Sequence, residues 1–531
     1  MSGKSVSLGN HEHWLGARRN ESSAIVRCPS IWRHQRARHL AGIVAPAFLL
    51  ASCAVGPNFV APEAPAVDRY TREPRLASTD STKTRGGNSQ SFSPGSDVSG
   101  VWWTLFRSRK LTAFVEEAVR NHPDIRSAEF ALRAARESAL AEEGTLFPQV
   151  SGSGSTAREQ GPLYKLFNTS VSVSYALDLW GGTRRQIEAL EAQADYQAFK
   201  LEATYLALTT NVITAAITDA SLRDQISATE EIVKAETDQL ARIQHQFDIG
   251  AVSKSDVLAQ ESTLAQAKAT LPQLQKQLAQ QRNQLMAYFG RLPSEDRGEH
   301  VMLAELRLPG QLPVSLPSDL IRQRPDIRQA EATLHQATAT VGVGVANLLP
   351  QITLSGSHGA SGTGKLFSPG TIAWDATSSI TQKLIDGGAL YHTKEADVAL
   401  FEQDMAAYKS TVIAAFQNVA DSLRAIQYDA ATLKAQAGAE RAASDSLSMS
   451  IEQFKTGAVP YANVITAQQS YLNARISRIK AQAARLADTA ALFQAIGGGW
   501  WNRADQTAYA SPRANPGYFA GPNRSTQEAV R

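Results

Sequence analysis

Hydrophobic and polar residues follow two different periods along the chain, and the same succession of periods occurs twice. Apolar residues recur at helical spacing over six segments: 111–143, 183–247, 253–289, 319–346, 389–454 and 460–495. Four shorter segments alternate at a period of two: 149–159, 169–179, 351–360 and 371–384. We therefore predict two pairs of strands, each pair followed by a hairpin of long helices.

Short motifs that recur in the same order identify an internal duplication. Three of them occur once in each half, at 123–126 and 325–328, 146–151 and 348–353, and 247–257 and 454–464. In the third pair, Gly250 and Gly457 stand where one long helical pattern ends and the next begins. Glycine adopts the left-handed conformation without a Cβ clash. Each copy is therefore interpreted as the tip of a helical hairpin.

The strand segments have one apolar face and one face rich in serine and threonine. Val171, Val173 and Tyr175 alternate with Ser170 and Ser172. This pattern is typical of a membrane barrel strand, although a half-buried sheet in a soluble protein would share it.

Four strands are too few for a closed barrel, because about eight are the practical minimum. Open strand edges inside a bilayer would leave backbone groups unpaired, at a cost of several kcal/mol each. We expect other copies of the chain to complete the sheet. This argument does not choose between two, three and four copies.

The long helical segments are suited to form walls around water. Residues 183–247 would span roughly 100 Å at the rise of an α-helix, and 389–454 a similar length. Their richness in Ala, Gln, Glu, Lys and Leu favours coiled-coil-like packing. The predicted fold class is a membrane β-barrel joined to a long α-helical barrel, built from duplicated halves with four strands per protomer.

The first residues predict a secretory signal. Residues 1–52 hold a basic head and a short apolar run, 40–50, that ends in Leu-Ala-Ser before Cys53. This ending resembles a bacterial lipobox, which implies cleavage before Cys53 and lipidation of its sulfur and its new amino group. The alternative is a buried cysteine near an ordinary cleavage site. Ala54 at the next position suggests onward export to the outer membrane.

Charge and cysteine usage exclude several functions. Removal of 1–52 takes seven of 53 basic and two of 50 acidic residues, so the mature chain is nearly neutral and nothing indicates nucleic acid. Cys53 is then the only cysteine, which excludes an internal disulfide. No phosphate loop, zinc signature or nucleophile turn occurs. We expect no enzyme activity, no metal site and no cofactor.

The predicted organisation places two repeats behind a lipidated start. Its segments are the signal peptide 1–52, a lipidated extended segment 53–105, a first repeat 106–298, a linker 299–318, a second repeat 319–500 and a disordered tail 501–531.

Taken together, these motifs resemble the outer-membrane-factor family of efflux channels, which are TolC-like, in its lipoprotein (OprM/NodT-like) branch. The matching segments are 50–59, 102–106, the twin Pro-Asp-Ile-Arg, 415–421, 454–457 and 496–500. The resemblance implies a homotrimer with a twelve-stranded barrel in the outer membrane and a helical tunnel through the periplasm. It also implies docking on a periplasmic adaptor (membrane fusion) protein served by an inner-membrane transporter. Such a channel is a passive exit for drugs or other small molecules and contributes to multidrug resistance.

The resemblance also assigns roles near the tips. The residues implied to close the periplasmic end are Asp256, Phe454, Val459, Asn463 and Thr466. Those implied to touch the adaptor are Gly250, Ala251, Val252, Ser253, Gly457, Ala458, Val459 and Pro460. Relatives often carry aspartates at the positions of Asn463 and Thr466, so closure is predicted to be more apolar here. The alternative is that the gate residues are ordinary residues at a helix start.

Two other functions remain open at this stage. A type I protein-secretion exit channel would share the fold, and a lipid-anchored periplasmic scaffold without a pore would share the helices. An outer-membrane enzyme is disfavoured because no catalytic constellation is present.

Overall fold

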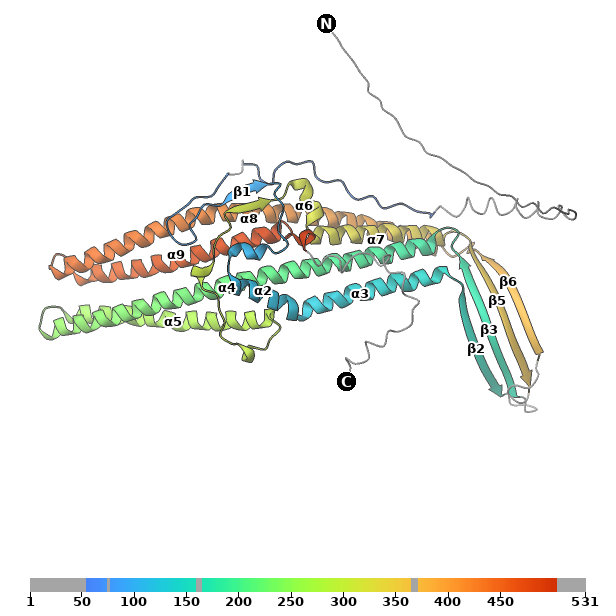
Figure 1. The fold of residues 1–531 in the computed structure, drawn as a ribbon, viewed down its shortest axis with the longest axis horizontal. Coiled ribbons are helices and arrows are strands. Elements are labelled where there is room, and N and C mark those ends of the chain that lie inside the picture. The colour runs from blue at the N-terminus through green and yellow to red at the C-terminus, as the bar shows by residue number, and fades with distance from the viewer. Residues whose placement is uncertain (1–53, 74–76, 159–164, 364–370, 504–531) are drawn as a thin grey trace, which may run out of the picture. The chain divides into compact units, whose positions relative to one another are not determined.

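The computed structural model describes residues 54–73, 77–158, 165–363 and 371–503, which belong to one compact unit (Figure 1). The predicted signal peptide, Cys53 and residues 504–531 of the predicted tail lie outside the described residues.

The helices occur where the sequence predicts them. In the described chain they are α2 (Arg109–Asn121), α3 (Pro123–Glu143), α4 (Gly182–Asp248), α5 (Lys254–Tyr288), α6 (Pro317–Gln323), α7 (Pro325–Asn347), α8 (Ala389–Lys455) and α9 (Tyr461–Ala495). Pro123 and Pro325 each begin a helix, because proline lacks the N–H that an interior position would need. None of these helices is both long and apolar enough to cross a bilayer.

The two longest helices set the dimensions of the unit. Both α4 and α8 have 67 residues, which corresponds to about 100 Å. Helix α4 packs against α3 and α5, and α8 packs against α7 and α9. Each half therefore places one unbroken helix beside two shorter ones (Figure 1).

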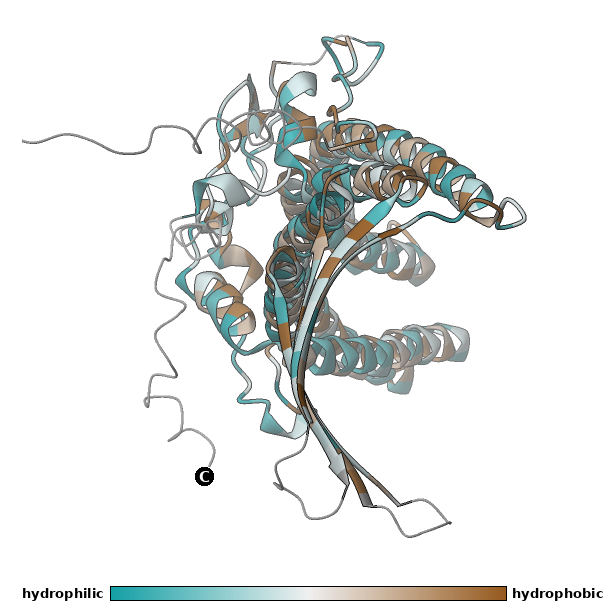
Figure 2. Ribbon diagram, turned by 90° about the vertical axis from the view of Figure 1, so that its right-hand side faces the viewer, coloured by the Kyte–Doolittle hydropathy of each residue, from teal (hydrophilic) through white to brown (hydrophobic). Residues whose placement is uncertain are grey.

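One antiparallel sheet lies at the end of the helices opposite the hairpin tips (Figure 1). Its strands, in the order β2-β3-β5-β6, are β2 (Gln149–Arg158), β3 (Lys165–Leu177), β5 (Gln351–Thr363) and β6 (Thr371–Thr381). The sheet is curved (Figure 2). In the described chain, β2 and β6 each have one edge without a partner strand.

The register of the sheet confirms the predicted alternation. One row across the four strands is polar: Ser151, Ser172, Ser357 and Asp375. The hydroxyls of Ser151 and Ser172 lie 2.9 Å apart, and Ser357 donates to Asp375.

The other face of the sheet is mainly apolar. Val171, His358 and Trp374 form one row on it, so His358 is an exception to the apolar pattern. Trp374 is 76% exposed and Ile372 is 70% exposed. Large apolar side chains left open in this way are suited to lipid rather than to water.

The core of the unit lies where the chain enters the first repeat. Trp102, Trp103 and Phe106 are buried, and the ring of Trp102 stacks on Phe493 of α9 with centroids 5.0 Å apart. The Trp-Trp-x-x-Phe motif is thus an aromatic core element.

The extended segment 53–105 and the linker 299–318 contain secondary structure that the sequence analysis did not predict. Ser91–Pro94 (β1) pairs in parallel with Gln311–Val314 (β4), and the linker also holds a 3-10 turn at Leu303–Glu305. Local patterning does not reveal a pairing between strands about 220 residues apart, and Pro94 and Pro313 weaken the strand signal.

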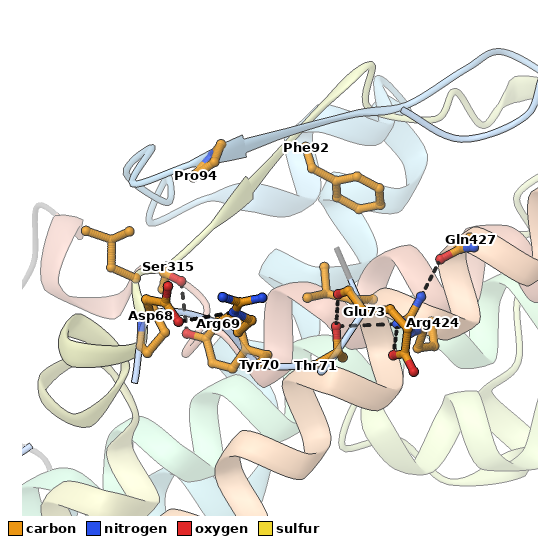
Figure 3. A pocket seen from close by; sticks show the side chains of 13 residues that line it. Asp68, Arg69, Tyr70, Thr71, Glu73, Phe92, Pro94, Ser315, Arg424 and Gln427 are labelled. Carbon is orange, nitrogen blue, oxygen red and sulfur yellow. Dashed lines mark hydrogen bonds and ion pairs between the residues drawn. The ribbon is translucent and has the colours of Figure 1, made fainter. Parts of the chain in front are cut away.

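The N-terminal segment is attached to the helices by arginines. Arg424 of α8 contacts Thr71 and Glu73, and the Tyr70 hydroxyl donates to the Ser315 carbonyl at 2.9 Å (Figure 3). The segment, the chain before α6 and helix α8 enclose a cavity of about 320 Å³ there.

A second arginine, Arg485 of α9, is completely buried beneath residues 79–88. It donates to the carbonyls of Gly86 at 2.9 Å and Asn88 at 2.7 Å, and to the Thr79 hydroxyl at 3.0 Å. This part of the predicted tether is therefore fixed.

We predict that Arg485→Met releases residues 79–88, because three acceptors lose their donor and the buried one, at Thr79, alone costs about 1–3 kcal/mol. Trypsin should then cleave after Lys83 or Arg85 at least tenfold faster than in the wild type. Arg441→Met changes an exposed arginine of α8 and serves as the matched control. Equal cleavage rates in the two variants would contradict this role.

Candidate functional site

The two hairpin tips have the same backbone geometry. Gly250 has a φ of 76° and Gly457 a φ of 73°. The amides of Ala251 and Ala458 each donate to a carbonyl five residues earlier, at 2.8 Å in both cases. This is the Schellman ending of a helix. A Cβ on either glycine would meet nothing within 4 Å, so conformation alone requires glycine here.

The predicted docking residues lie at these tips. Gly250, Ala251, Ser253, Gly457, Ala458 and Pro460 are exposed, while Val252 and Val459 are half-buried. The structure thus brings both docking segments to one end of the unit (Figure 1).

The predicted gate residues are in different environments. Asp256 caps its own helix, because its carboxylate accepts from the Ser253 amide at 3.0 Å and from the Ser253 hydroxyl at 2.7 Å. Asn463 and Thr466 are exposed, and the Thr466 hydroxyl donates to the Ala462 carbonyl. Within the described part of the chain, no hydrogen bond joins Asp256 to α9.

An apolar cluster holds the two hairpins together behind the tips. Its buried members are Ile243, Val257, Tyr461 and Val464, which come from α4, α5 and α9. Phe454, a predicted gate residue, packs on this cluster with its ring 5.0 Å from that of Tyr461.

A buried polar chain crosses from one hairpin to the other beside this cluster. The Tyr461 hydroxyl donates to the side-chain carbonyl of Gln260 at 2.7 Å, and the Gln260 amide donates to the Glu236 carboxylate at 2.6 Å. All three side chains are buried. The chain fixes α9 against α4 and α5, and therefore fixes the relative positions of the two tips.

Burial determines the protonation of this chain. It raises the pKa of Glu236, although the hydrogen bond from Gln260 acts in the opposite direction. Burial also raises the pKa of Tyr461, so the phenol keeps the proton that it donates.

Sequence reasoning missed Glu236, Gln260 and Tyr461. Glutamate and glutamine at these positions of a long polar helix look like solvated residues. Only the packing of the second hairpin on the first buries them. The signal that could have indicated a contact was Tyr461, a large aromatic residue directly after the second tip.

Among the described residues, no cluster of three or more His, Cys, Asp or Glu side chains has the arrangement of a metal site.

A lipid-compatible sheet joined to twin helical hairpins defines an outer-membrane channel fold. The sequence model of the outer membrane efflux protein family matches residues 114–291 and 316–498. The chain therefore belongs to the outer membrane efflux protein family, as the resemblance indicated.

Curated relatives match most of the chain. The antibiotic efflux pump outer membrane protein ArpC of Pseudomonas putida is 27% identical over 495 residues, which cover 90% of this chain and 98% of ArpC. A nodulation protein T of Rhizobium leguminosarum is 29% identical over 473 residues, covering 87% and 93%. The cation efflux system protein CusC of Escherichia coli is 26% identical over 418 residues, covering 75% and 88%.

Solved channels share the fold. The outer-membrane channel OprN superposes with a TM-score of 0.74 at 23% identity, covering 84% of this chain and 100% of OprN. The MtrE channel of Neisseria gonorrhoeae in its open state gives 0.73 at 24% identity, covering 84% and 99%. The predicted fold class is thereby confirmed.

We predict that Tyr461→Phe loosens the closed arrangement of the tips. The change leaves the buried Gln260 carbonyl without its donor, at a cost of about 1–3 kcal/mol. The open probability of channels in planar bilayers should rise several-fold. Tyr428→Phe removes the same hydroxyl from an exposed position of α8 and should behave as the wild type. Unchanged gating in Tyr461→Phe would rule out this link.

We also predict that acid favours closure through Glu236. The pKa of Glu236 in this structure lies above its ordinary value, so the arrangement of the tips described above is most stable below that ordinary value. We take this arrangement as the closed one. It loses stability as the pH rises through the raised pKa. Open probability should therefore fall as the pH is lowered from neutral toward 4.5.

The matched variant for this effect is Glu236→Gln, which keeps an acceptor for Gln260 and removes the charge. Its open probability at neutral pH should equal that of the acidified wild type. The charges of Asp256 and Arg242 also act on the pKa of Tyr461. Asp256→Asn and Arg242→Gln therefore serve as separate controls. A full acid response in Glu236→Gln would exclude this carboxyl as the source.

Proposed function

We propose that three copies of the chain form a passive exit duct through the outer membrane. The observation that supports this proposal most directly is the four-stranded sheet. The outer edges of β2 and β6 have no partner strand within the described chain. Edge β6 of one copy can pair with edge β2 of the next, and three copies would supply twelve strands. The repeats 106–298 and 319–500 would each contribute one strand pair and one hairpin.

Lipid attachment at Cys53 is part of this proposal. The lipobox-like ending at Cys53 supports it, and so does the position of the described residues that follow. Ala54 contacts the chain at Gly181, directly after the β3 end of the sheet. A lipid on the preceding residue would therefore lie near the membrane-facing part of the protein.

The tips would dock on a periplasmic adaptor that connects the duct to an inner-membrane transporter. The turns at Gly250 and Gly457 support this assignment, since both glycines are exposed and a Cβ on either would meet nothing within 4 Å. The names of the relatives refer to antibiotics, toluene and cations. We infer that this duct carries drugs or other small molecules and that the transporter selects them. No catalytic role is proposed.

The docking assignment predicts that a double Gly250→Trp, Gly457→Trp variant loses drug resistance while it still assembles. Bulky side chains would block an adaptor at both tips, and resistance of a deletion strain carrying the variant should fall to the level of the empty strain. Gly298→Trp is the matched control, because Gly298 also has a positive φ and open surroundings. It carries the same backbone strain, about 1–2 kcal/mol, away from the tips. Full resistance in the double variant would refute docking at these turns.

A further inference from the structure

The first described residues of the chain, 54–59, lie against α4 and α7, with residues 56–58 exposed on their outer side. Arg185, in the first turn of α4, is buried beneath this segment. It donates to the Val55 carbonyl at 3.1 Å and to the Asn58 side-chain oxygen at 2.6 Å. Its Nη1 forms an ion pair of 2.7 Å with Glu188.

Two glycines allow the segment to approach α7 closely. Gly56 has a φ of +89°, and a Cβ on it would lie 2.5 Å from the Cα of Gly342 in α7. A Cβ on Gly342 would in turn lie 2.9 Å from the Arg185 side chain. Glycine inside a helix is unfavourable relative to alanine, so Gly342 has a packing reason here.

The segment is also attached at both of its ends. The Val55 amide donates to the Trp180 carbonyl at 2.9 Å, just after β3. At the other end, the Phe59 ring stacks on His335 of α7 with centroids 4.4 Å apart. His335 lies 3.0 Å from the Glu188 carboxylate, so one network of charges and rings lies beneath the segment.

The ion pair in this network persists at neutral pH. Burial raises the pKa of Glu188, but hydrogen bonds from Arg185 and His335 outweigh burial and leave the pKa below its ordinary value. The carboxylate therefore remains charged and keeps Arg185 oriented toward the segment.

We propose that this surface of α4 and α7 is a docking site for the amino end of the mature chain, which positions the lipid of Cys53 beside the strands. The inference rests on the proposed lipidation, and it gives residues 54–59 and the helices that hold them the role of placing the lipid. Undocked, residues 54–69 could place the lipid anywhere within roughly 55 Å of the next attachment at Tyr70. Docked, the lipid is held within one residue of Ala54, at the junction of sheet and helices. The anchor then fixes the depth of the sheet in the bilayer.

The docking is tested on the full chain in outer membranes with chymotrypsin, which cleaves after the half-buried Phe59. Gly342→Ala should displace Arg185, and Arg185→Met removes it. Both variants should be cleaved at this position at least tenfold faster than the wild type. The matched control is Gly438→Ala, since Gly438 is also inside a long helix but a Cβ there meets nothing within 4 Å. Wild-type cleavage rates in Gly342→Ala and Arg185→Met would overturn the docking site.

The positioning role is tested by moving the lipid relative to the docking site. Six Gly/Ser residues inserted between Cys53 and Ala54 should leave Phe59 protected but reduce the fraction of protein inserted in the membrane several-fold. The same insertion between Val60 and Ala61 should leave membrane insertion unchanged. Equal effects of the two insertions would overturn the positioning role.

Metabolic labelling with a palmitate analogue separates this inference from the function on which it rests. Label on the wild type and on all variants is the expected result. Its absence from the wild type would refute the lipid anchor and with it the positioning role. The protease comparison would still decide whether α4 and α7 hold residues 54–59.

Discussion

The pairing of backbone groups in the sheet is the constraint on which the rest of the structure depends. Strands that face lipid on one side have no water to satisfy an open edge. The chain nevertheless supplies four strands, with apolar residues such as Ile372 and Trp374 exposed on one face. A single copy is therefore an incomplete membrane protein. Assembly with further copies would complete this sheet.

The duplicated plan connects this sheet with the tips at the opposite end of the helices. Helices α4 and α8 both run from the sheet to a tip without interruption, so each repeat includes a strand pair and a tip at opposite ends. The residues at which the two hairpins contact each other differ between the repeats. The Tyr461–Gln260–Glu236 chain joins the second hairpin to the first, and no equivalent was visible in the repeated motifs. In the proposed function, gating would then depend on a contact between repeats, and docking would use the turns that both repeats share.

Much of the fold could be predicted from sequence because its signals are local and repeated. The period of each element, the prolines that begin α3 and α7, and the glycines of the two tips each reflect short-range physics. The roles of buried polar residues were not predictable in this way. Arg185, Arg485 and Gln260 look like solvated residues of polar helices, and only contacts with segments far away in sequence bury them. The pairing of β1 with β4 was missed for the same reason.

The number of copies in the detergent-solubilised assembly tests the central claim most directly, because the sheet of one copy is unfinished. Native mass spectrometry of the protein extracted from outer membranes measures that number. The account predicts a stable complex of three copies. A stable single copy that remains folded without detergent would contradict it.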